Sequence, residues 1–176
     1  TLAQRIKDSL DGRIREFEVI QMAFDMLSAL ECMHGQGVIH RDLKPANIVL
    51  TEEDGQLVCK LTDFSIAAVE QESREEVSRS LQTGTATLQA VTGTPHYMSP
   101  EQVSEGLMVT AQTDLWSLGV VMFESLSGKL PFAPDERDRF KIGVAIQNHS
   151  EAPELSDVIE EVGAVTDGVA DFTLRA

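Results

Sequence analysis

The sequence predicts a mainly α-helical domain with one small β-hairpin. Three stretches support this fold class: apolar residues at helical spacing over 14–34, two strand-like runs on either side of Asp54-Gly55, and an apolar run at 114–126. The chain has 176 residues, of which 42% are hydrophobic and 24% charged, so it can bury a core of its own.

Residues 14–34 predict one long helix, because apolar side chains recur there every three or four positions. Gly35 and Gly37 favour an end directly after it. The apolar stripe consists of Phe17, Ile20, Phe24, Leu27 and Leu30, widened by Ala23, Met26 and Met33.

The next elements are two short strands at 48–50 and 57–61. The sequence TEEDGQ joins them, and its Asp54-Gly55 pair is a strong signal for a hairpin turn. Residues 70–92 are rich in Ser, Thr, Glu and Gln without a clear period, so we expect a long loop with one short helical piece near 72–81.

The run at 114–126 is apolar on nearly every side, which predicts a helix that is buried all round. Asp114 can cap its start, and Gly128 follows its end. Further helices are expected at 137–147, 154–163 and 168–175.

The composition of the chain disfavours some classes of partner. The net charge of −15 disfavours nucleic acid as a partner, because phosphate binding needs clustered Lys and Arg. The acidic excess indicates a well-solvated surface or an attraction for basic substrates. No run approaches the ~20 apolar residues of a membrane span, and the first residues lack the apolar core of a signal peptide. We therefore expect a cytoplasmic protein without a membrane partner, with Cys32 and Cys59 as reduced core thiols.

The polar residues that carry chemistry fall in separated segments: HRDLKPAN at 40–47, DFS at 63–65, GTPHYMSPE at 93–101 and DLWSLG at 114–119. In order and spacing they resemble the Ser/Thr branch of the protein kinase family, whose patterns are HRDLKPxN, DFG, GTxxYxxPE and DxWSxG. One such pattern alone would be weak, but four in register are specific.

The resemblance implies a protein-kinase-like fold and covers only the larger, C-terminal lobe. No glycine-rich loop and no strand lysine precede residue 14, so we expect the N-terminal lobe to be absent. Residues 1–176 are then a partial kinase domain, truncated at both ends, with an activation loop at about 63–101.

The same resemblance implies ATP and Mg²⁺ as cofactors and proteins with Ser or Thr acceptors as substrates. It assigns Asp42 as the catalytic base and Lys44 as the cation that neutralises the transferring phosphoryl group of ATP. Asn47 and Asp63 would hold the Mg²⁺ ions, which prefer hard oxygen ligands. Val49 would be a floor for the adenine ring, or simply a core valine.

Other motif residues have a functional and a plainer interpretation. Thr94 resembles the threonine that contacts the base and the lysine, but it could also be an ordinary loop residue. His40 is expected to pack on Phe64 rather than to act as a base. Asp114 is either a helix cap or a brace for the backbone of the 40–42 turn. Glu101 should lack its family partner, an arginine that this sequence does not contain.

Arg41 before the base is typical of kinases that are switched on by loop phosphorylation, because a phosphate pairs well with arginine. The candidate sites are Thr85, Thr87 and Thr92. Ser65 replaces the glycine of the family motif, and we expect slower switching of the loop rather than lost chemistry.

Two functions remain open from the sequence. The first is a Ser/Thr kinase, of which this fragment alone transfers phosphate poorly because the N-terminal lobe that would cover ATP is absent. The second is a pseudokinase-like or lobe-only binding module without catalysis.

Overall fold

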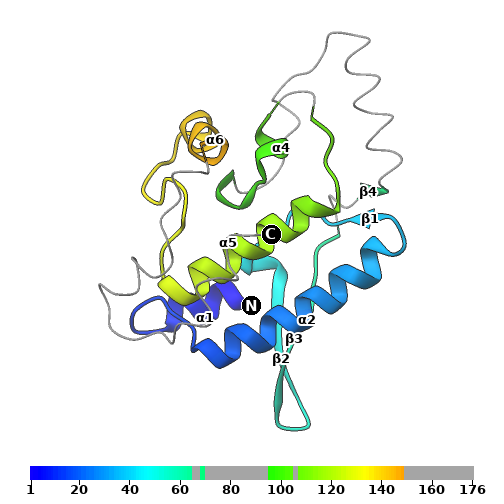
Figure 1. Cartoon of the computed structure of the whole chain (residues 1–176). Helices are drawn as coiled ribbons and strands as arrows, with labels where there is room; N and C mark the ends of the chain where they lie inside the picture. The colour runs from blue at the N-terminus through cyan, green and yellow to red at the C-terminus, as the bar shows by residue number, and fades with distance from the viewer. Residues whose placement is uncertain (65–67, 70–94, 105–106, 149–176) are drawn as a thin grey trace.

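The structure, a computed structural model, describes residues 1–64, 68–69, 95–104 and 107–148 (Figure 1). The loop expected at 70–92 and the helices expected at 154–163 and 168–175 lie outside these residues. Within them, the helices are α1 (Leu2–Asp8), α2 (Glu16–His34), α4 (Pro100–Val103), α5 (Ala111–Ser127) and α6 (Arg139–Gln147), with two 3₁₀ turns at Pro45–Asn47 and Pro95–Tyr97. The strands are β1 (Val38–Ile39), β2 (Ile48–Glu53), β3 (Gln56–Leu61) and β4 (Ala68–Val69).

The predicted hairpin is confirmed. β2 pairs antiparallel with β3 from Ile48 opposite Leu61 to Glu53 opposite Gln56. Asp54 and Gly55 have φ values of 51° and 77°, the left-handed pair that a two-residue hairpin turn requires. Both strands are longer than predicted, because the polar residues beside the turn continue the ladder.

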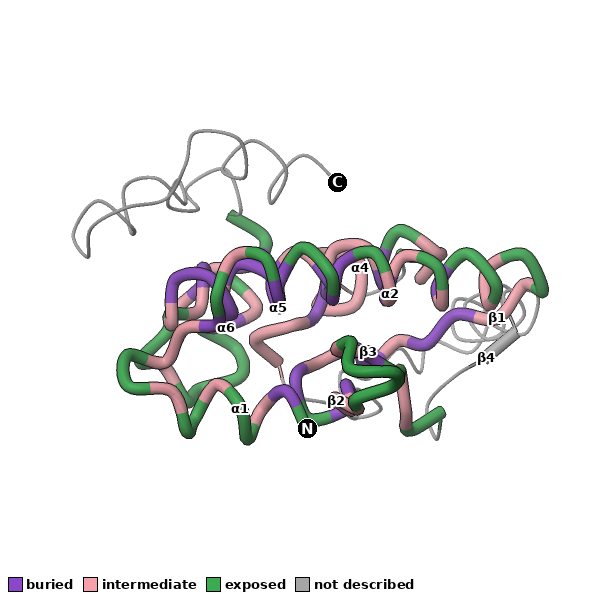
Figure 2. The backbone as a smooth tube through the Cα atoms, turned by 90° about the horizontal axis from the view of Figure 1, so that it is seen from below, coloured by how far each residue is buried: buried purple, intermediate pink, exposed green. Residues whose placement is uncertain are grey.

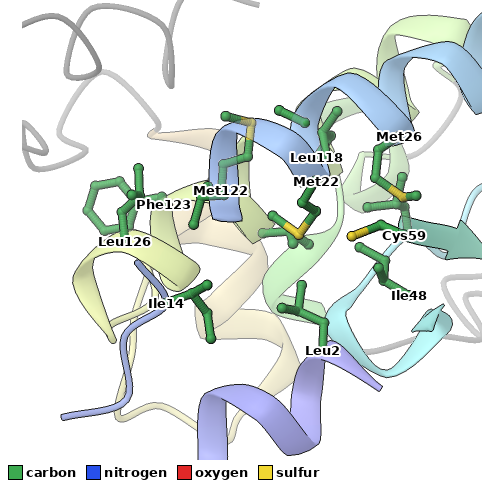
Figure 3. Packing of buried hydrophobic residues seen from close by; sticks show 14 of the residues in the cluster. Leu2, Ile14, Met22, Met26, Ile48, Cys59, Leu118, Met122, Phe123 and Leu126 are labelled. Atoms are coloured by element: carbon green, nitrogen blue, oxygen red, sulfur yellow. The ribbon is translucent and has the colours of Figure 1, made fainter. Parts of the chain in front are cut away.

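The long helices α2 and α5 lie side by side, with α1 and the hairpin on the same side of the pair (Figures 1 and 2). Figure 3 shows the core between them, where Met22 and Met26 of α2 lie among side chains of α5 and the hairpin. The unbranched methionine side chain adapts to such an irregular space. The largest side chain in this core is Phe123 of α5, which is fully buried.

The buried face of α2 agrees with the expected apolar stripe only in part. Phe17 and Phe24 are 61% and 65% exposed, and Ile20 is 40% exposed. Arg15 lies over the Phe17 ring, 4.6 Å from its centroid. The expected stripe was therefore too wide, because apolar residues recur at helical spacing on more than one side of α2. The buried residues are Glu18, Val19, Met22, Ala23, Met26 and Leu30.

Helix α5 is buried on most sides, as predicted, but it begins earlier. Its N-cap is Thr110, and Asp114 lies in the first turn rather than at the cap. Gly128 ends the helix at φ 72°, and a Cβ there would lie 2.8 Å from the carbonyl oxygen of Asp11. Both the left-handed backbone and this close approach require glycine.

A second, smaller core joins α5 to α6 and the turn before α4. The rings of Trp116 and Phe132 stack with centroids 5.4 Å apart, and Met98, Ile142 and Ile146 pack around them. Within the parts of the chain that the structure describes, no helix is long and apolar enough to cross a bilayer.

The cysteine prediction holds for one of the two residues. Cys59 is a buried free thiol, and burial, followed by the nearby Asp25 carboxylate, raises its pKa to about 11. Cys32 is a free thiol too, but it is exposed on α2, so its placement in the core was wrong.

Candidate active site

The backbone of the 40–42 turn is held by Asp114 of α5. Its Oδ2 accepts the N–H of His40 at 2.9 Å, and its Oδ1 accepts the N–H of Arg41 at 2.9 Å. His34 at the end of α2 donates to the same Oδ2 at 2.7 Å. Asp114 is fully buried, so these three donors replace water around its carboxylate. The expectation that Asp114 braces this turn is confirmed.

Arg41 adopts a left-handed backbone with φ 68°. This conformation costs a residue other than glycine about 1–2 kcal/mol. The charge-assisted hydrogen bond to Asp114 is worth a similar amount, about 1.5–3 kcal/mol. The strained turn is therefore stable because a buried carboxylate fixes it.

His40 has a structural role. Its Nε2 donates to the carbonyl oxygen of Thr62 at 3.1 Å, and its Nδ1 accepts the N–H of Asp42 at 3.3 Å. The ring is fully buried and meets the edge of Phe64 with centroids 5.4 Å apart. The ring contact confirms the expected packing of His40 on Phe64. Both ring nitrogens of His40 are hydrogen-bonded within the fold.

Asp42, Lys44 and Asn47 come together after this turn. Lys44 Nζ lies 2.6 Å from Asp42 Oδ2. Asn47 Nδ2 donates to the backbone oxygen of Asp42 at 2.8 Å and to its Oδ2 at 3.2 Å. Asp42 is only 9% exposed and Asn47 only 5% exposed. One carboxylate thus meets a cation and an amide at the end of the hairpin.

Asp63 leaves the hairpin at the end where Asn47 enters it. The residue before it, Thr62, donates from both its backbone nitrogen and its hydroxyl to the carbonyl oxygen of Asn47, at 2.9 and 3.0 Å. Asp63 itself is exposed and has φ 65°. The ladder between β2 and β3 therefore brings two residues sixteen positions apart to one end of the sheet.

The side-chain oxygen atoms of Asn47 and Asp63 are of the kinds that bind a hard cation such as Mg²⁺. Both hydrogen bonds of the Asn47 side chain use its nitrogen, so the amide oxygen is the atom that would bind a metal. Asp63 adds a carboxylate, and oxygen ligands of these two kinds suit Mg²⁺.

The remaining predicted site residues have mixed outcomes. Val49 lies on β2 opposite Lys60 and is half-buried. Thr94 lies outside the described residues, as do Ser65 and the three threonines proposed for phosphorylation. Glu101 accepts a hydrogen bond at Oε1 from the Thr113 hydroxyl at 2.5 Å, a partner that the sequence did not predict.

A second polar pair lies between the segment that leads to α4 and helix α5. The hydroxyl of Tyr97 donates to Glu124 Oε2 at 2.7 Å. Burial raises the pKa of both groups, and for Tyr97 the charge of Glu124 adds to that effect. The hydrogen bond from Tyr97 lowers the pKa of Glu124 again, but less than burial raises it.

Two residues that support the turn were not predicted from the sequence. They are His34, which shares Asp114 with the turn, and Gln102, whose Nε2 donates to the carbonyl oxygen of Arg41 at 2.8 Å. Neither residue belongs to one of the four motif segments, although Gln102 directly follows the segment 93–101.

A helical domain in which the HRD turn rests on a buried aspartate of α5, with the DF segment beside it, is the arrangement expected for a protein kinase. The chain belongs to the protein kinase domain family, whose model matches residues 1–172.

Among curated proteins, the chain is 37% identical to a probable serine/threonine-protein kinase of Clostridium acetobutylicum over 77% of its own length and 18% of that protein. It is 40% identical to a similarly named protein of Clostridium perfringens over 77% of this chain and 17% of the relative. It is 36% identical to the serine/threonine-protein kinase PknB of Mycolicibacterium smegmatis over 88% of this chain and 23% of the relative. The chain thus spans about a fifth of the length of these relatives.

Proposed function

We propose that the protein containing this chain is a serine/threonine kinase that transfers the γ-phosphate of ATP to Ser and Thr hydroxyls of protein substrates. The observation that carries the proposal is the convergence of Asp42, Lys44 and Asn47 at hydrogen-bond distances. The hydrogen bonds from Thr62 to Asn47 keep the next residue, Asp63, at the same end of the hairpin. The family and the names of its relatives support this class of reaction.

Each residue of the site has a separate proposed role in phosphoryl transfer, a reaction that depends mainly on positioning and charge neutralisation. Asp42 orients the substrate hydroxyl and accepts its proton. Lys44, already beside Asp42, neutralises charge on the phosphoryl group. Asn47 and Asp63 would hold Mg²⁺, which would supply positive charge against the phosphates of ATP. Val49 is the proposed floor for adenine.

Thr94 is proposed to contact Asp42 and Lys44 and to favour Ser/Thr acceptors. We assign residues 1–176 to the larger, C-terminal lobe of the kinase domain, with the activation loop at about 63–101. The proposed setting is cytoplasmic. The partners are proteins rather than nucleic acid, in keeping with the net charge of −15.

These 176 residues alone are proposed to transfer phosphate at a negligible rate. The sequence contains no glycine-rich loop and no strand lysine before residue 14 to hold the ATP phosphates. Positioning of those phosphates supplies much of the rate in this reaction class.

The test is a transfer assay with radiolabelled ATP and Mg²⁺ on the product of the complete gene. Incorporation into Ser and Thr of a mixed peptide substrate is measured, followed by analysis of the labelled residues. Asp42→Asn should lower the turnover by about 10²- to 10⁴-fold, the usual contribution of a positioned base. Asp54→Asn is the matched control, because it makes the same change in a hairpin turn that accepts asparagine.

The outcomes separate the two candidate functions. An unchanged rate in Asp42→Asn would remove the base assignment. A wild-type protein that is folded but incorporates no phosphate would favour the non-catalytic binding module. Equal activity of the 176-residue chain and the complete product would contradict the proposed weakness of the fragment.

A further inference from the structure

The carbonyl group of Arg41 is bound by a side chain from a distant part of the sequence. Gln102 of α4 lies 61 positions further along the chain, and its Nε2 donates to this oxygen at 2.8 Å. On the other side of the same residue, the N–H of Arg41 donates to Asp114 at 2.9 Å. Both backbone polar groups of Arg41 are therefore fixed by side chains of other elements.

This double attachment falls on a residue that needs it. Arg41 is left-handed at φ 68°, a conformation that L-residues keep only where the surroundings enforce it. The next residue is Asp42, the proposed base. A rotation of the backbone at Arg41 would carry the Asp42 side chain away from Lys44 and Asn47, which it contacts now.

We propose that Gln102 is a positioning residue for Asp42, which acts by holding the carbonyl group of Arg41. The inference rests on the proposed kinase function and goes beyond it, because it assigns a role to a residue outside the reacting set. It also joins α4, which follows the segment 93–101, to the turn that carries the base.

The competing explanation is that Gln102 only caps α4. Its Oε1 accepts the N–H of Ser99 at 3.0 Å, as part of a capping box between Ser99 and Gln102. A cap of this kind needs only the acceptor oxygen, which glutamate supplies equally well. The bond to Arg41 needs the amide nitrogen. The two roles therefore use different atoms of one side chain and can be separated by substitution.

Gln102→Glu keeps the acceptor for Ser99 and removes the donor to Arg41. Ser99→Ala is the control for the cap: it removes the hydroxyl, which lies 3.4 Å from Gln102 Oε1, but keeps the backbone N–H that donates to Oε1 and the donor Nε2. Both variants are made in the product of the complete gene. Their turnover, their KM for ATP and the hydrogen exchange of the peptide that covers the 40–42 turn are measured.

For Gln102→Glu we expect a turnover lower by about tenfold, because small misplacements of a reacting group are costly, with the KM for ATP changed by less than about twofold. Amide exchange in the 40–42 turn should become faster by about tenfold, the effect of losing one ordinary hydrogen bond. Ser99→Ala should leave both quantities close to wild type.

A double-mutant cycle adds a readout that a purely structural role would not move. Glycine adopts the left-handed conformation freely. In an Arg41→Gly background the further change Gln102→Glu should therefore lower the turnover by only about twofold, since the strain that Gln102 opposes is gone. An equal loss in both backgrounds would overturn the mechanism.

The exchange measurement keeps this inference separate from the proposed function. If the wild-type protein transfers no phosphate, the kinase proposal fails, but faster exchange in Gln102→Glu still supports the attachment of the turn. If the wild-type protein is active and Gln102→Glu matches it in turnover and exchange, the positioning role is wrong and the kinase proposal stands.

Discussion

At the scale of single residues, the buried polar groups differ in how well their charge is compensated. Asp114 accepts three hydrogen bonds from donors that include His34. Glu124 is held by Tyr97, and burial leaves its pKa above the ordinary value. The first carboxylate stabilises a turn, whereas the second weakens the fold whenever it is ionised.

Glu124 gives a prediction about pH. Its raised pKa means that the folded state favours the protonated form. The stability it contributes is therefore complete below the ordinary value of 4.5 and is lost as the pH rises through the raised value. Glu124→Gln cannot ionise and still accepts the bond from Tyr97. Urea denaturation should show this variant gaining stability relative to wild type between pH 4.5 and 8.

The control for this experiment is Glu136, whose pKa is shifted in the opposite direction. Hydrogen bonds from the backbone of Asp138 and Arg137 lower the pKa of Glu136, so its contribution is present above the ordinary value and is lost as the pH falls. Glu136→Gln should gain nothing at pH 8. A Glu124→Gln variant that runs parallel to wild type at every pH would show that Glu124 titrates normally.

The resemblance to the kinase family predicted the residues of the site better than their supports. It indicated Asp42, Asn47 and Asp63 as one group from the patterns at 40–47 and 63–65, and their metal and catalytic roles remain predictions. Gln102 and His34 act through single hydrogen bonds across long separations in sequence. A single polar residue in or beside a helix leaves no periodic signal, and this is why both were missed.

At the scale of elements, the strongest local signals predicted structure and the weaker ones did not. The hairpin was predictable because Asp54-Gly55 fixes its turn and thereby its register. The pairing of β1 with β4 was not, because it joins residues 31 and 29 positions apart in two-residue strands. The face of α2 was predicted only in part, because apolar residues recur at helical spacing on more than one side of this helix.

This last error leads to a prediction at the same scale. Met26 is fully buried in the core between α2 and α5, whereas Phe24, two residues earlier, is 65% exposed. Met26→Ala should lower the free energy of unfolding by about 2–5 kcal/mol, the range for large-to-small changes in a core. Phe24→Ala should change it by less than about 0.5 kcal/mol, as surface substitutions do. If Phe24→Ala proved the more harmful in urea denaturation, the side of α2 that carries Phe24 would be the buried one.

At the scale of the whole molecule, Asp114 links three parts of the chain by hydrogen bonds. It belongs to α5, binds His34 at the end of α2, and holds the backbone of His40 and Arg41. The main core therefore continues into the site without a break: α2 packs on α5, and α5 fixes the turn that precedes Asp42. Stability and site geometry depend on the same carboxylate.

Asp114→Asn tests this dependence. An asparagine offers one acceptor oxygen where the carboxylate offers two, and its NH₂ group would face a backbone N–H or His34. Leaving a buried donor unpaired costs about 1–3 kcal/mol, so we expect the free energy of unfolding to fall by that amount. Urea denaturation should show this as a lower midpoint with an unchanged slope. Asp138→Asn is the control, because Asp138 is an N-cap where asparagine serves equally well. Its midpoint should match wild type.

The same variant should release the turn as well as weaken the fold. In conditions where Asp114→Asn is still folded, hydrogen exchange of the amides of His40 and Arg41 should become faster, because these two N–H groups are the ones that the carboxylate holds. Exchange within the β2–β3 hairpin should change little, since its ladder does not involve α5. A variant with wild-type midpoint and wild-type exchange at the turn would show that Asp114 is not the residue through which the core supports the site.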